Sequence, residues 1–468
     1  MEQQRGQWSG RLGFILAAAG SAVGLGNLWK FPYIAWENDG GAFVLVYIIA
    51  VALVGIPIMI AETLLGRRGK KDPIGTFRAL AEGKRGARLW PGVGVLGVIT
   101  GVIILSYYSV IAGWTLRYIG MAVSGHLGEL AGQAGGLDGF FLGFIGSGNQ
   151  QVLWTFCFMA ATTLVVVFGV QNGIERAARI LMPVLFGILV VLVVYAATTK
   201  GFGRALAFIF RPNFGDLTRG GVLEAVGHSF FTLSLGMGVM LTYGSYMRKE
   251  DSIPRAAVTI SILDTVIAIM ACMIMYSIIF SYDMPVGKSS AILFTTLPAV
   301  FFQMPGGALV SGLFYLLVAF AALTSTISLL EVVSSYAIDE LGWQRRKATL
   351  TVAAAIFCFG ILSALSVGGS DAPGNATLSG INIIGRESTQ GFFGTMDYLA
   401  SNWCLPVGGF LIALFTGWAL TRRETQEELE QGHGLMRLFP LWRFLIKFAA
   451  PAAVGAIIVS VILGAEYQ

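Results

Sequence analysis

Charged residues are scarce in this chain of 468 residues: Asp, Glu, Lys and Arg make up 12% of it, against 55% hydrophobic residues. A soluble domain carries roughly a quarter of its residues as charges, because its surface must face water. The mean hydropathy of +0.73 points the same way. The composition therefore excludes an ordinary soluble protein, and the small net charge of +5 gives no indication of nucleic-acid binding.

Cysteine and histidine are also rare, with four and three residues respectively. The four cysteines lie in apolar runs, and their spacing matches no metal-binding or redox motif, so they read as buried thiols. We find no nucleophile–base set, metal motif or phosphate-binding loop in the sequence. It therefore predicts neither an enzyme nor an organic cofactor.

What the chain has in abundance is apolar runs long enough to cross a bilayer, which takes about 20 residues of helix. We expect an all-α integral membrane protein with the lipid bilayer as its main partner. The expected eleven transmembrane helices lie roughly at 11–36, 41–66, 89–123, 152–170, 175–198, 224–247, 255–282, 306–339, 346–367, 393–420 and 440–464.

The basic residues predict the orientation, because lysine and arginine accumulate on the cytoplasmic side. The connection 66–88 carries eight of them, whereas 124–151 carries none. Most other basic clusters fall on the same side as 66–88, whereas four basic residues in 200–219 fall on the opposite side. We expect a multi-pass protein with its N-terminus in the cytoplasm and, because the number of spans is odd, its C-terminus outside.

Two of the expected spans are interrupted by glycine at mid-depth. The first span has Gly20, Gly24 and Gly26, and the sixth has Gly236 and Gly238. Unwound backbone in lipid is tolerated only where it lines a cavity or is buried in protein. Close helix packing would explain one such span. Two in corresponding halves, with hydroxyl and amide side chains beside them, point to the binding site of a transporter.

The residues at these breaks resemble the neurotransmitter:sodium symporter family. The matching segments are Gly20-Ser-Ala-Val-Gly-Leu-Gly-Asn-Leu-Trp-Lys-Phe-Pro32, Glu37-Asn-Asp-Gly-Gly-Ala-Phe43, Tyr107-Tyr108 with Trp114, Phe230-Phe-Thr-Leu-Ser-Leu-Gly236 and Ala321-Ala-Leu-Thr-Ser-Thr326. The chain looks most like the bacterial amino-acid branch, especially multi-substrate hydrophobic amino-acid transporters with Gly-Met-Gly in the sixth helix. This implies the bacterial inner membrane.

The resemblance implies the leucine-transporter fold. The chain would then be one transporter domain, 1–468, with unwound helices 1 and 6. Residues 1–200 and 221–421 would be two inverted repeats of five helices each, and 422–468 would supply helix 11. A monomer or weak dimer is expected.

The resemblance also implies two sodium ions. The first would be bound by the Ala22 carbonyl, Asn27, Thr232 and Asp264, with the substrate carboxylate as a shared ligand that couples the two binding events. The second would be bound by the carbonyls of Gly20, Val23 and Ala321 with the hydroxyls of Thr324 and Ser325. Taken alone, these two hydroxyls would be expected to hydrogen-bond back to their own helix.

Asp264 is a carboxylate inside an apolar span, where a functional role is the default. Relatives often have an amide at this position and need chloride or a nearby glutamate for charge balance. Here the position that matches the glutamate is Ala268. We expect Asp264 to supply the negative charge, which would make transport chloride-independent. A protonated, hydrogen-bonded aspartate is the alternative.

The two breaks are expected to form the substrate site. Helix N-termini and the Tyr108 hydroxyl suit a carboxylate. Glycine at position 24 indicates an α-amino acid, because monoamine carriers of the family have aspartate there. The predicted substrate-binding residues are Ala22, Gly24, Leu25, Gly26, Ile104, Tyr108, Phe231, Thr232, Ser234, Met237, Ser325 and Leu329. For Ile104 and Leu329, ordinary core packing stays open.

Further residues match the gates of the family. Lys30 and Asp397 would form the outer charged gate, where most relatives have arginine instead of lysine, so the contact would be weaker. In the fifth span, Gly173 and Pro183 would allow unwinding that opens the way out from the second sodium site.

On the cytoplasmic side, Arg5 with Asp339, and Trp8 near Tyr246, match the inner network of the family. Solvated helix ends are the alternative for Lys30 and Arg5.

Together these observations predict a sodium-coupled symporter that imports hydrophobic L-amino acids, aliphatic and aromatic, by alternating access. Two alternatives stay open. One is a symporter restricted to tyrosine or tryptophan. The other is an amino-acid sensor that does not transport.

Overall fold

The computed structural model describes residues 6–215, 217–283, 292–367, 391–431 and 436–465. Within these ranges all regular structure is helical, as the apolar runs predict. Among the described residues, nine helices are long and apolar enough to cross a membrane, and the bent pair α1 (Arg11–Ala22) and Gly26–Glu37 makes a tenth. The remaining expected span consists of two shorter helices, α12 (Arg219–Thr232) and α13 (Val239–Ser245). The all-α membrane fold is thus confirmed.

The bounds of the spans follow the expected ranges closely. After the first break the chain forms η1 (Gly26–Lys30) and α2 (Phe31–Glu37). The uninterrupted spans are α3–η2–α4 (Gly41–Ala50, Val51–Gly55, Ile56–Gly69), α6 (Pro91–Ser124), α9 (Gly148–Val167), η3–α10 (Val170–Glu175, Arg176–Ala197), α14 (Ile253–Ser281), α16 (Gly307–Asp339), α17 (Arg345–Ser366), α18–η7–α19–η8 (Gly391–Tyr398, Leu399–Cys404, Leu405–Leu414, Phe415–Ala419) and α21–η10–α22 (Phe439–Phe444, Leu445–Ala449, Ala450–Ile462).

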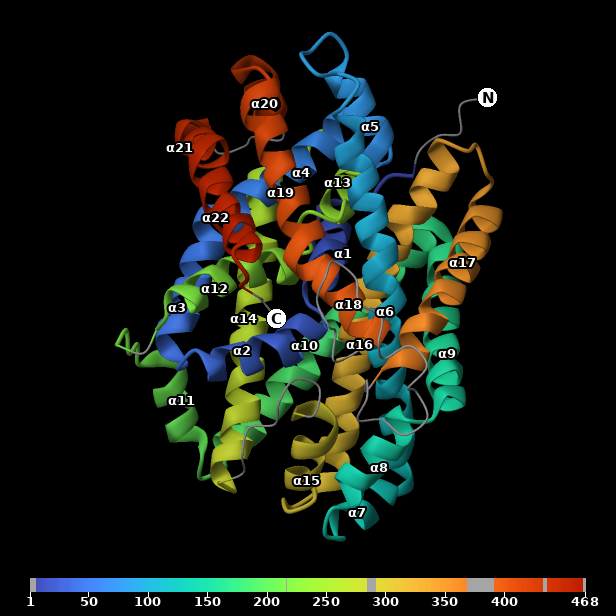
Figure 1. Ribbon diagram of the computed structural model, residues 1–468, viewed down its shortest axis with the longest axis vertical. Coiled ribbons are helices and arrows are strands. Elements are labelled where there is room, and N and C mark those ends of the chain that lie inside the picture. Colours follow the sequence, from blue (N-terminus) through green and yellow to red (C-terminus); the bar gives the residue numbers. More distant parts are fainter. Residues whose placement is uncertain (1–5, 216, 284–291, 368–390, 432–435, 466–468) are drawn as a thin grey trace.

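Short helices connect the spans at both ends of the bundle. They are α5 (Pro73–Ala81), α7 (His126–Ala131), α8 (Gly136–Ile145), α11 (Phe202–Phe210), η4–α15 (Ile292–Thr296, Leu297–Phe301), α20 (Arg422–Glu430) and η9 (Met436–Leu438). Helices α5 and α20 lie at the same end as the N-terminus, and α7, α8 and α15 lie at the opposite end (Figure 1). The eight basic residues of 66–88 therefore belong to the end that the sequence predicts to be cytoplasmic.

Local sequence explains where several helices begin. Proline occupies the first turn of α5, α6 and α14, where its missing N–H costs no hydrogen bond. The Asp72 carboxylate caps α5 by accepting the Ile74 amide at 3.0 Å. Thr421 and Glu424 form a capping box at the start of α20.

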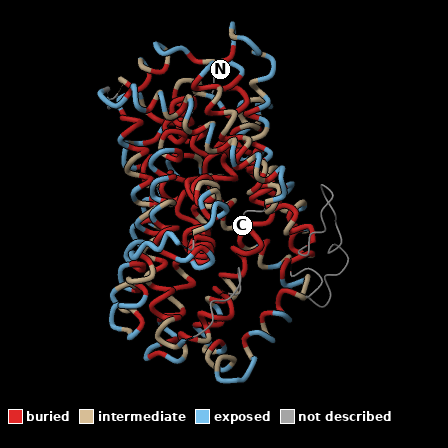
Figure 2. The backbone as a smooth tube through the Cα atoms, turned by 60° about the vertical axis from the view of Figure 1, so that its left-hand side comes forward, coloured by how far each residue is buried: buried red, intermediate tan, exposed pale blue. Residues whose placement is uncertain are grey.

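Both predicted breaks are present at the centre of the molecule. Helix α1 ends at Ala22 because Val23 is extended (φ −74°, ψ 99°), and the axis bends by 48° before the helix resumes at Gly26. Beyond α12, Ser234, Gly236 and Gly238 have positive φ. A Cβ on Gly236 would also lie 2.5 Å from the Leu405 carbonyl oxygen, so only glycine fits there. Residues 21–30 and 232–240, which contain the two breaks, are all buried, and Figure 2 shows how much of the interior backbone is buried.

Candidate functional site

A small cavity lies between the two breaks, and α6 and α16 close its sides. Eleven of the twelve predicted substrate-binding residues line it. The twelfth, Leu25, points into the neighbouring hollow on the Lys30 side. The residues that line the cavity are Ser21, Ala22, Gly24, Gly26, Ile104, Tyr108, Phe231, Thr232, Ser234, Met237, Ser325, Ser328 and Leu329. No charged side chain is among them, so any net charge in the cavity must come from the ligand or from ions.

Gly24 lies beside two hydroxyl groups of this cavity. A Cβ on Gly24 would lie 2.6 Å from the Ser325 hydroxyl and 2.8 Å from the Tyr108 hydroxyl. The Tyr108 oxygen accepts the Leu25 amide at 2.9 Å, which fixes the phenol and leaves its own proton available to donate. The break thus presents a hydrogen-bond donor beside a space that only a glycine leaves open.

The four residues predicted to bind the first sodium come from three separate spans. Asp264 lies on α14 and is fully buried. It accepts hydrogen bonds from Asn27 Nδ2 at 2.7 Å and from Thr232 Oγ1 at 2.9 Å. The Asn27 oxygen accepts the Gly24 amide at 3.0 Å, so the same side chain caps the break. The Ala22 carbonyl belongs to the last residue of α1 before the break.

Sequence reasoning missed one member of this group. The Tyr47 hydroxyl on α3 donates to Asp264 Oδ2 at 3.1 Å. A tyrosine in an apolar run gives no local sign of such a contact, because its partner lies 217 residues away.

The residues predicted to bind the second sodium lie side by side between α1 and α16. A Cβ on Gly20 would lie 3.1 Å from Thr324 Cβ. Thr324 Oγ1 donates to the Ala321 carbonyl at 3.0 Å, and Ser325 Oγ donates to the same carbonyl at 3.2 Å. Val23 ends α1 with an extended ψ, so its carbonyl leaves the helical direction. Both hydroxyls thus hydrogen-bond back to their own helix, which is the alternative to sodium binding. Their role as sodium ligands stays a prediction.

A chain of serines joins the two breaks to α16. The Ser21 carbonyl, freed by the end of α1, accepts from Ser234 Oγ at 2.9 Å and from Ser325 Oγ at 3.2 Å. Ser21 Oγ lies 2.6 Å from Ser328 Oγ. Sequence reasoning did not assign Ser328, although it follows Ser325 by three residues and therefore shares its helix face.

The sixth-span break has a second anchor in Glu62 of α4. This carboxylate is fully buried, and its Oε1 accepts the Gly236 amide at 2.7 Å. The unwound backbone of a membrane protein needs such a partner, because the hydrocarbon of the bilayer offers no hydrogen bonds.

The outer side of the cavity is closed by an ion pair and an aromatic ring. Lys30 Nζ lies 3.0 Å from Asp397 Oδ1 and 4.6 Å from the centre of the Phe231 ring. The predicted outer pair is thus formed, with a cation–π contact that the sequence did not reveal. Phe231 also lies against Gly26, where a Cβ would be 3.0 Å from the ring.

The inner side is closed by the segment before α1. The Trp8 amide donates to the Tyr246 carbonyl at 3.1 Å, and its indole N–H donates to the Tyr243 carbonyl at 2.9 Å. The Tyr246 hydroxyl donates to the buried Glu331 at 2.6 Å, and Glu331 pairs with Arg345. The predicted proximity of Trp8 and Tyr246 is present.

The other predicted inner pair is only half described. Asp339 accepts the Asp72 amide at 2.7 Å, and Arg5 lies outside the described residues. In the fifth span, the segment from Gly173 to Pro183 is helical in this conformation, so its unwinding stays a prediction.

Comparison with known proteins gives consistent results along the whole chain. The model of the "Sodium:neurotransmitter symporter family" matches residues 5–129 and 142–467. An uncharacterized sodium-dependent transporter, YhdH of Bacillus subtilis (strain 168), is 37% identical over 463 residues, 98% of each chain. An uncharacterized sodium-dependent transporter of Haemophilus influenzae is 30% identical, again over 98% of each chain. The crystal structure of MhsT in complex with L-phenylalanine is similar with a TM-score of 0.87 and 40% identity, covering 97% of this chain and 99% of the other.

Proposed function

The chain belongs to the sodium:neurotransmitter symporter family, and on that premise we propose that it imports hydrophobic L-amino acids, aliphatic and aromatic, together with sodium. The family match and the related transporters show that the protein is a sodium-coupled membrane transporter and not an enzyme. MhsT was crystallised with L-phenylalanine. A hydrophobic substrate for the present chain is supported by the cavity itself.

The observation that carries the proposal is the mixed lining of the cavity. Its polar groups include the Tyr108 hydroxyl and the backbone of the breaks around Gly24, which suit the carboxylate and amine of an α-amino acid. Its apolar residues include Ile104, Met237 and Leu329, and no charged side chain lines it to pair with a charged substrate. Burying an unpaired charge there would be costly, so lysine and glutamate should be rejected.

The same geometry supports a broad substrate range over a narrow one. Met237 is a flexible side chain that fills irregular space. It lies between Gly236 and Gly238, whose positive φ values place Met237 in the unwound segment. The cavity is small in this conformation, so a phenylalanine-sized substrate requires lining side chains to move outward.

Two sodium ions are proposed to accompany the substrate. Asp264 would balance the charge of the first ion, with Asn27 and Thr232 as neighbouring ligands already in contact with it. The second ion would lie between Gly20 and Thr324. Because the cavity closes on both sides, by Lys30–Asp397 outside and by Trp8 inside, access would alternate between the two faces.

Competition for uptake tests the substrate class. In proteoliposomes with a sodium gradient, excess unlabelled leucine, isoleucine, valine, methionine, phenylalanine, tyrosine and tryptophan should each suppress uptake of labelled leucine. Lysine, arginine, aspartate and glutamate should not, because the apolar wall offers them no counter-charge.

Two results would contradict this assignment. Inhibition by lysine or glutamate but not by phenylalanine would refute the cavity model, and inhibition by tyrosine and tryptophan alone would favour the narrow-range symporter. Binding of leucine without accumulation under a sodium gradient would instead identify a sensor.

Replacing Lys30 by glutamine should weaken the outer gate. The pair with Asp397 is partly buried, and losing about 1 kcal/mol of it corresponds to roughly fivefold faster release of bound leucine. The measurement is the dissociation rate of labelled leucine in saturating sodium. Lys200→Gln, at an exposed lysine on the same expected side, is the matched control. Equal release rates in both variants would show that the pair does not hold the gate.

A further inference from the structure

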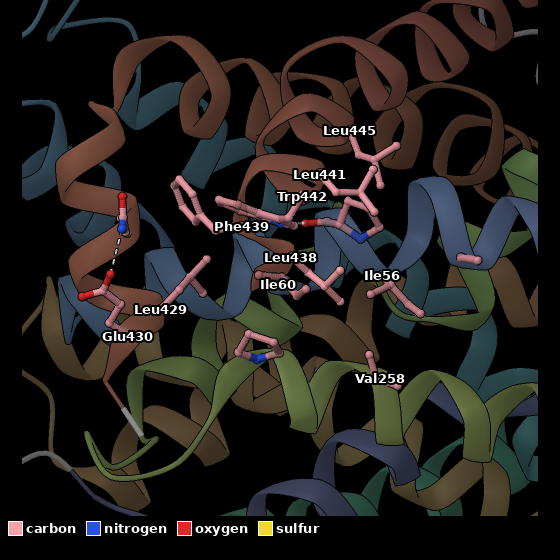
Figure 3. A pocket seen from close by; sticks show the side chains of 14 residues that line it. Ile56, Ile60, Val258, Leu429, Glu430, Leu438, Phe439, Leu441, Trp442 and Leu445 are labelled. Atoms are coloured by element: carbon pink, nitrogen blue, oxygen red, sulfur yellow. Dashed lines mark hydrogen bonds between the residues drawn. The ribbon is translucent and has the colours of Figure 1, made fainter. Parts of the chain in front are cut away.

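A second and larger hollow lies away from the breaks, where η2, α4 and α14 meet α20 and α21. Its free space is about 230 Å³, and a cavity of about 150 Å³ with apolar walls already holds benzene. Twelve of its 14 lining residues are apolar, and Figure 3 shows side chains from α4, α14 and α21 converging on it. We call it the apolar groove, and it is lined by Ala52, Ile56, Pro57, Ile60, Pro254, Val258, Gln426, Leu429, Glu430, Leu438, Phe439, Leu441, Trp442 and Leu445.

The groove has a fixed floor and an exposed rim. Trp442 is 6% exposed, and its indole N–H donates to the Pro57 carbonyl at 3.1 Å, which ties α21 to α4. Leu438 and Leu441 at the rim are 50% and 54% exposed. Helices α4, α14 and α21 belong to apolar spans, whereas Leu438 lies in the connecting helix η9. The rim therefore lies where the spans meet the connections at this end of the bundle.

Two basic side chains that have no ion-pair partner among the described residues border the groove. The Arg422 guanidinium lies 5.8 Å from the centre of the Phe439 ring, which forms part of the lining. Arg437 is exposed and directly precedes Leu438 of the rim. Neither arginine has an ion-pair partner among the described residues. Their charge is therefore available to a ligand.

The other charged groups near the groove do not neutralise the positive charge of Arg422 and Arg437. Arg443 is within electrostatic range of Arg422 and adds a third positive charge. The one carboxylate that lines the groove, Glu430, accepts from Gln426 Nε2 at 2.8 Å. Glu424 is also within range of Arg443, but Lys84 pairs with it at 2.9 Å.

We propose that the apolar groove binds one acyl chain of an anionic phospholipid, whose phosphate is held by Arg422 and Arg437. Lipid tails are as apolar as leucine, so a tail gains little by leaving the bilayer for the groove. Selectivity must come from the headgroup. Guanidinium groups donate paired hydrogen bonds to phosphate oxygens, and basic sites between membrane helices on the cytoplasmic side attract anionic lipids.

Photoreactive lipid tests both parts of this proposal. The purified full-length protein in detergent is titrated with phosphatidylglycerol that carries a photoreactive acyl chain, and its binding is measured by native mass spectrometry. After illumination, peptide mapping locates the cross-links. We expect them in 254–258 and 438–445, and we expect weaker binding of the matched phosphatidylcholine.

A pair of arginine variants separates the headgroup contact from general surface charge. The double variant Arg422→Gln/Arg437→Gln should bind phosphatidylglycerol about 30-fold more weakly, at roughly 1 kcal/mol for each basic residue. Arg423→Gln is the control, because Arg423 neighbours Arg422 on α20 but already pairs with Glu427 at 2.7 Å. Its binding should be unchanged.

Several outcomes would overturn the proposal. They are equal binding of phosphatidylcholine, equal affinities of the double variant and the control, cross-links outside the groove, and protein–protein cross-links that show a second copy covering it. The wild-type cross-linking map stands even if the double variant does not fold. No transport is measured, so the result is independent of the proposed substrate.

Discussion

Asp264→Asn should lower the apparent sodium affinity of leucine binding by about 100- to 1,000-fold. Asparagine keeps the shape of the side chain but removes its charge. At about 4 Å, one opposite charge contributes roughly 4 kcal/mol in a protein of effective dielectric 20, which sets the upper end of this range. The measurement is equilibrium binding of labelled leucine across a sodium titration.

The structure offers a matched control for this substitution. Asp283 lies just beyond the end of α14, is exposed, and pairs with Arg204 at 2.8 Å. Asp283→Asn should leave the sodium titration unchanged. If Asp264→Asn behaves in the same way, Asp264 is the protonated, hydrogen-bonded group of the alternative interpretation, because asparagine would keep those contacts.

Anion replacement tests the charge balance directly. If Asp264 supplies the negative charge, as we propose, uptake by the wild-type protein should be equal in chloride and in gluconate. The residual uptake of Asp264→Asn should be higher in chloride. Loss of wild-type uptake in gluconate would refute chloride independence.

Gly24→Ala should weaken leucine binding by about 10- to 100-fold while the protein still folds. The new methyl group would lie 2.6 Å from the Ser325 hydroxyl and 2.8 Å from the Tyr108 hydroxyl. Both contacts are with side-chain hydroxyls and not with backbone, so we expect the methyl group to displace the substrate-facing donors and to fill the space between them. The expected 10- to 100-fold loss corresponds to about 1.4–2.7 kcal/mol of binding free energy.

Gly227→Ala on α12 is the control for this variant. Nothing lies within 4 Å of a Cβ at that position, so binding and thermal stability should both be retained. Thermal unfolding of Gly24→Ala should stay close to wild type. Wild-type leucine affinity in Gly24→Ala would show that the substrate does not occupy the space beside this glycine.

Much of the fold is determined by sequence patterns over short distances. The apolar runs place the spans to within a few residues, and the glycines at 24 and 236 mark the breaks. Most of the candidate cavity followed from motif residues at those breaks, because a break in lipid needs a cavity or a protein partner beside it. Gly24 is the clearest case, because the absence of a side chain at this position leaves the space between the Ser325 and Tyr108 hydroxyls open.

Other members of the site were not predictable from local pattern. Tyr47 reads as one more aromatic in an apolar run, and Glu62 as an isolated buried acid. Their contacts with Asp264 and with the Gly236 amide join residues 217 and 174 positions apart. The apolar groove is a similar case, because its walls come from four separate segments, three in or next to apolar spans and one in the charged helix α20, and none of them indicates a groove by itself.

The sequence by itself determined that this protein is a bundle of membrane helices with two interrupted at mid-depth, because hydrophobicity and glycine act on the backbone within a few turns. Only the tertiary structure decided which freed backbone groups meet which side chains. Ser234 and Ser325 both donate to the Ser21 carbonyl, because the sixth-span break and α16 pack against the end of α1 at that point. Such a meeting depends on the relative placement of whole helices, which no stretch of the chain encodes alone.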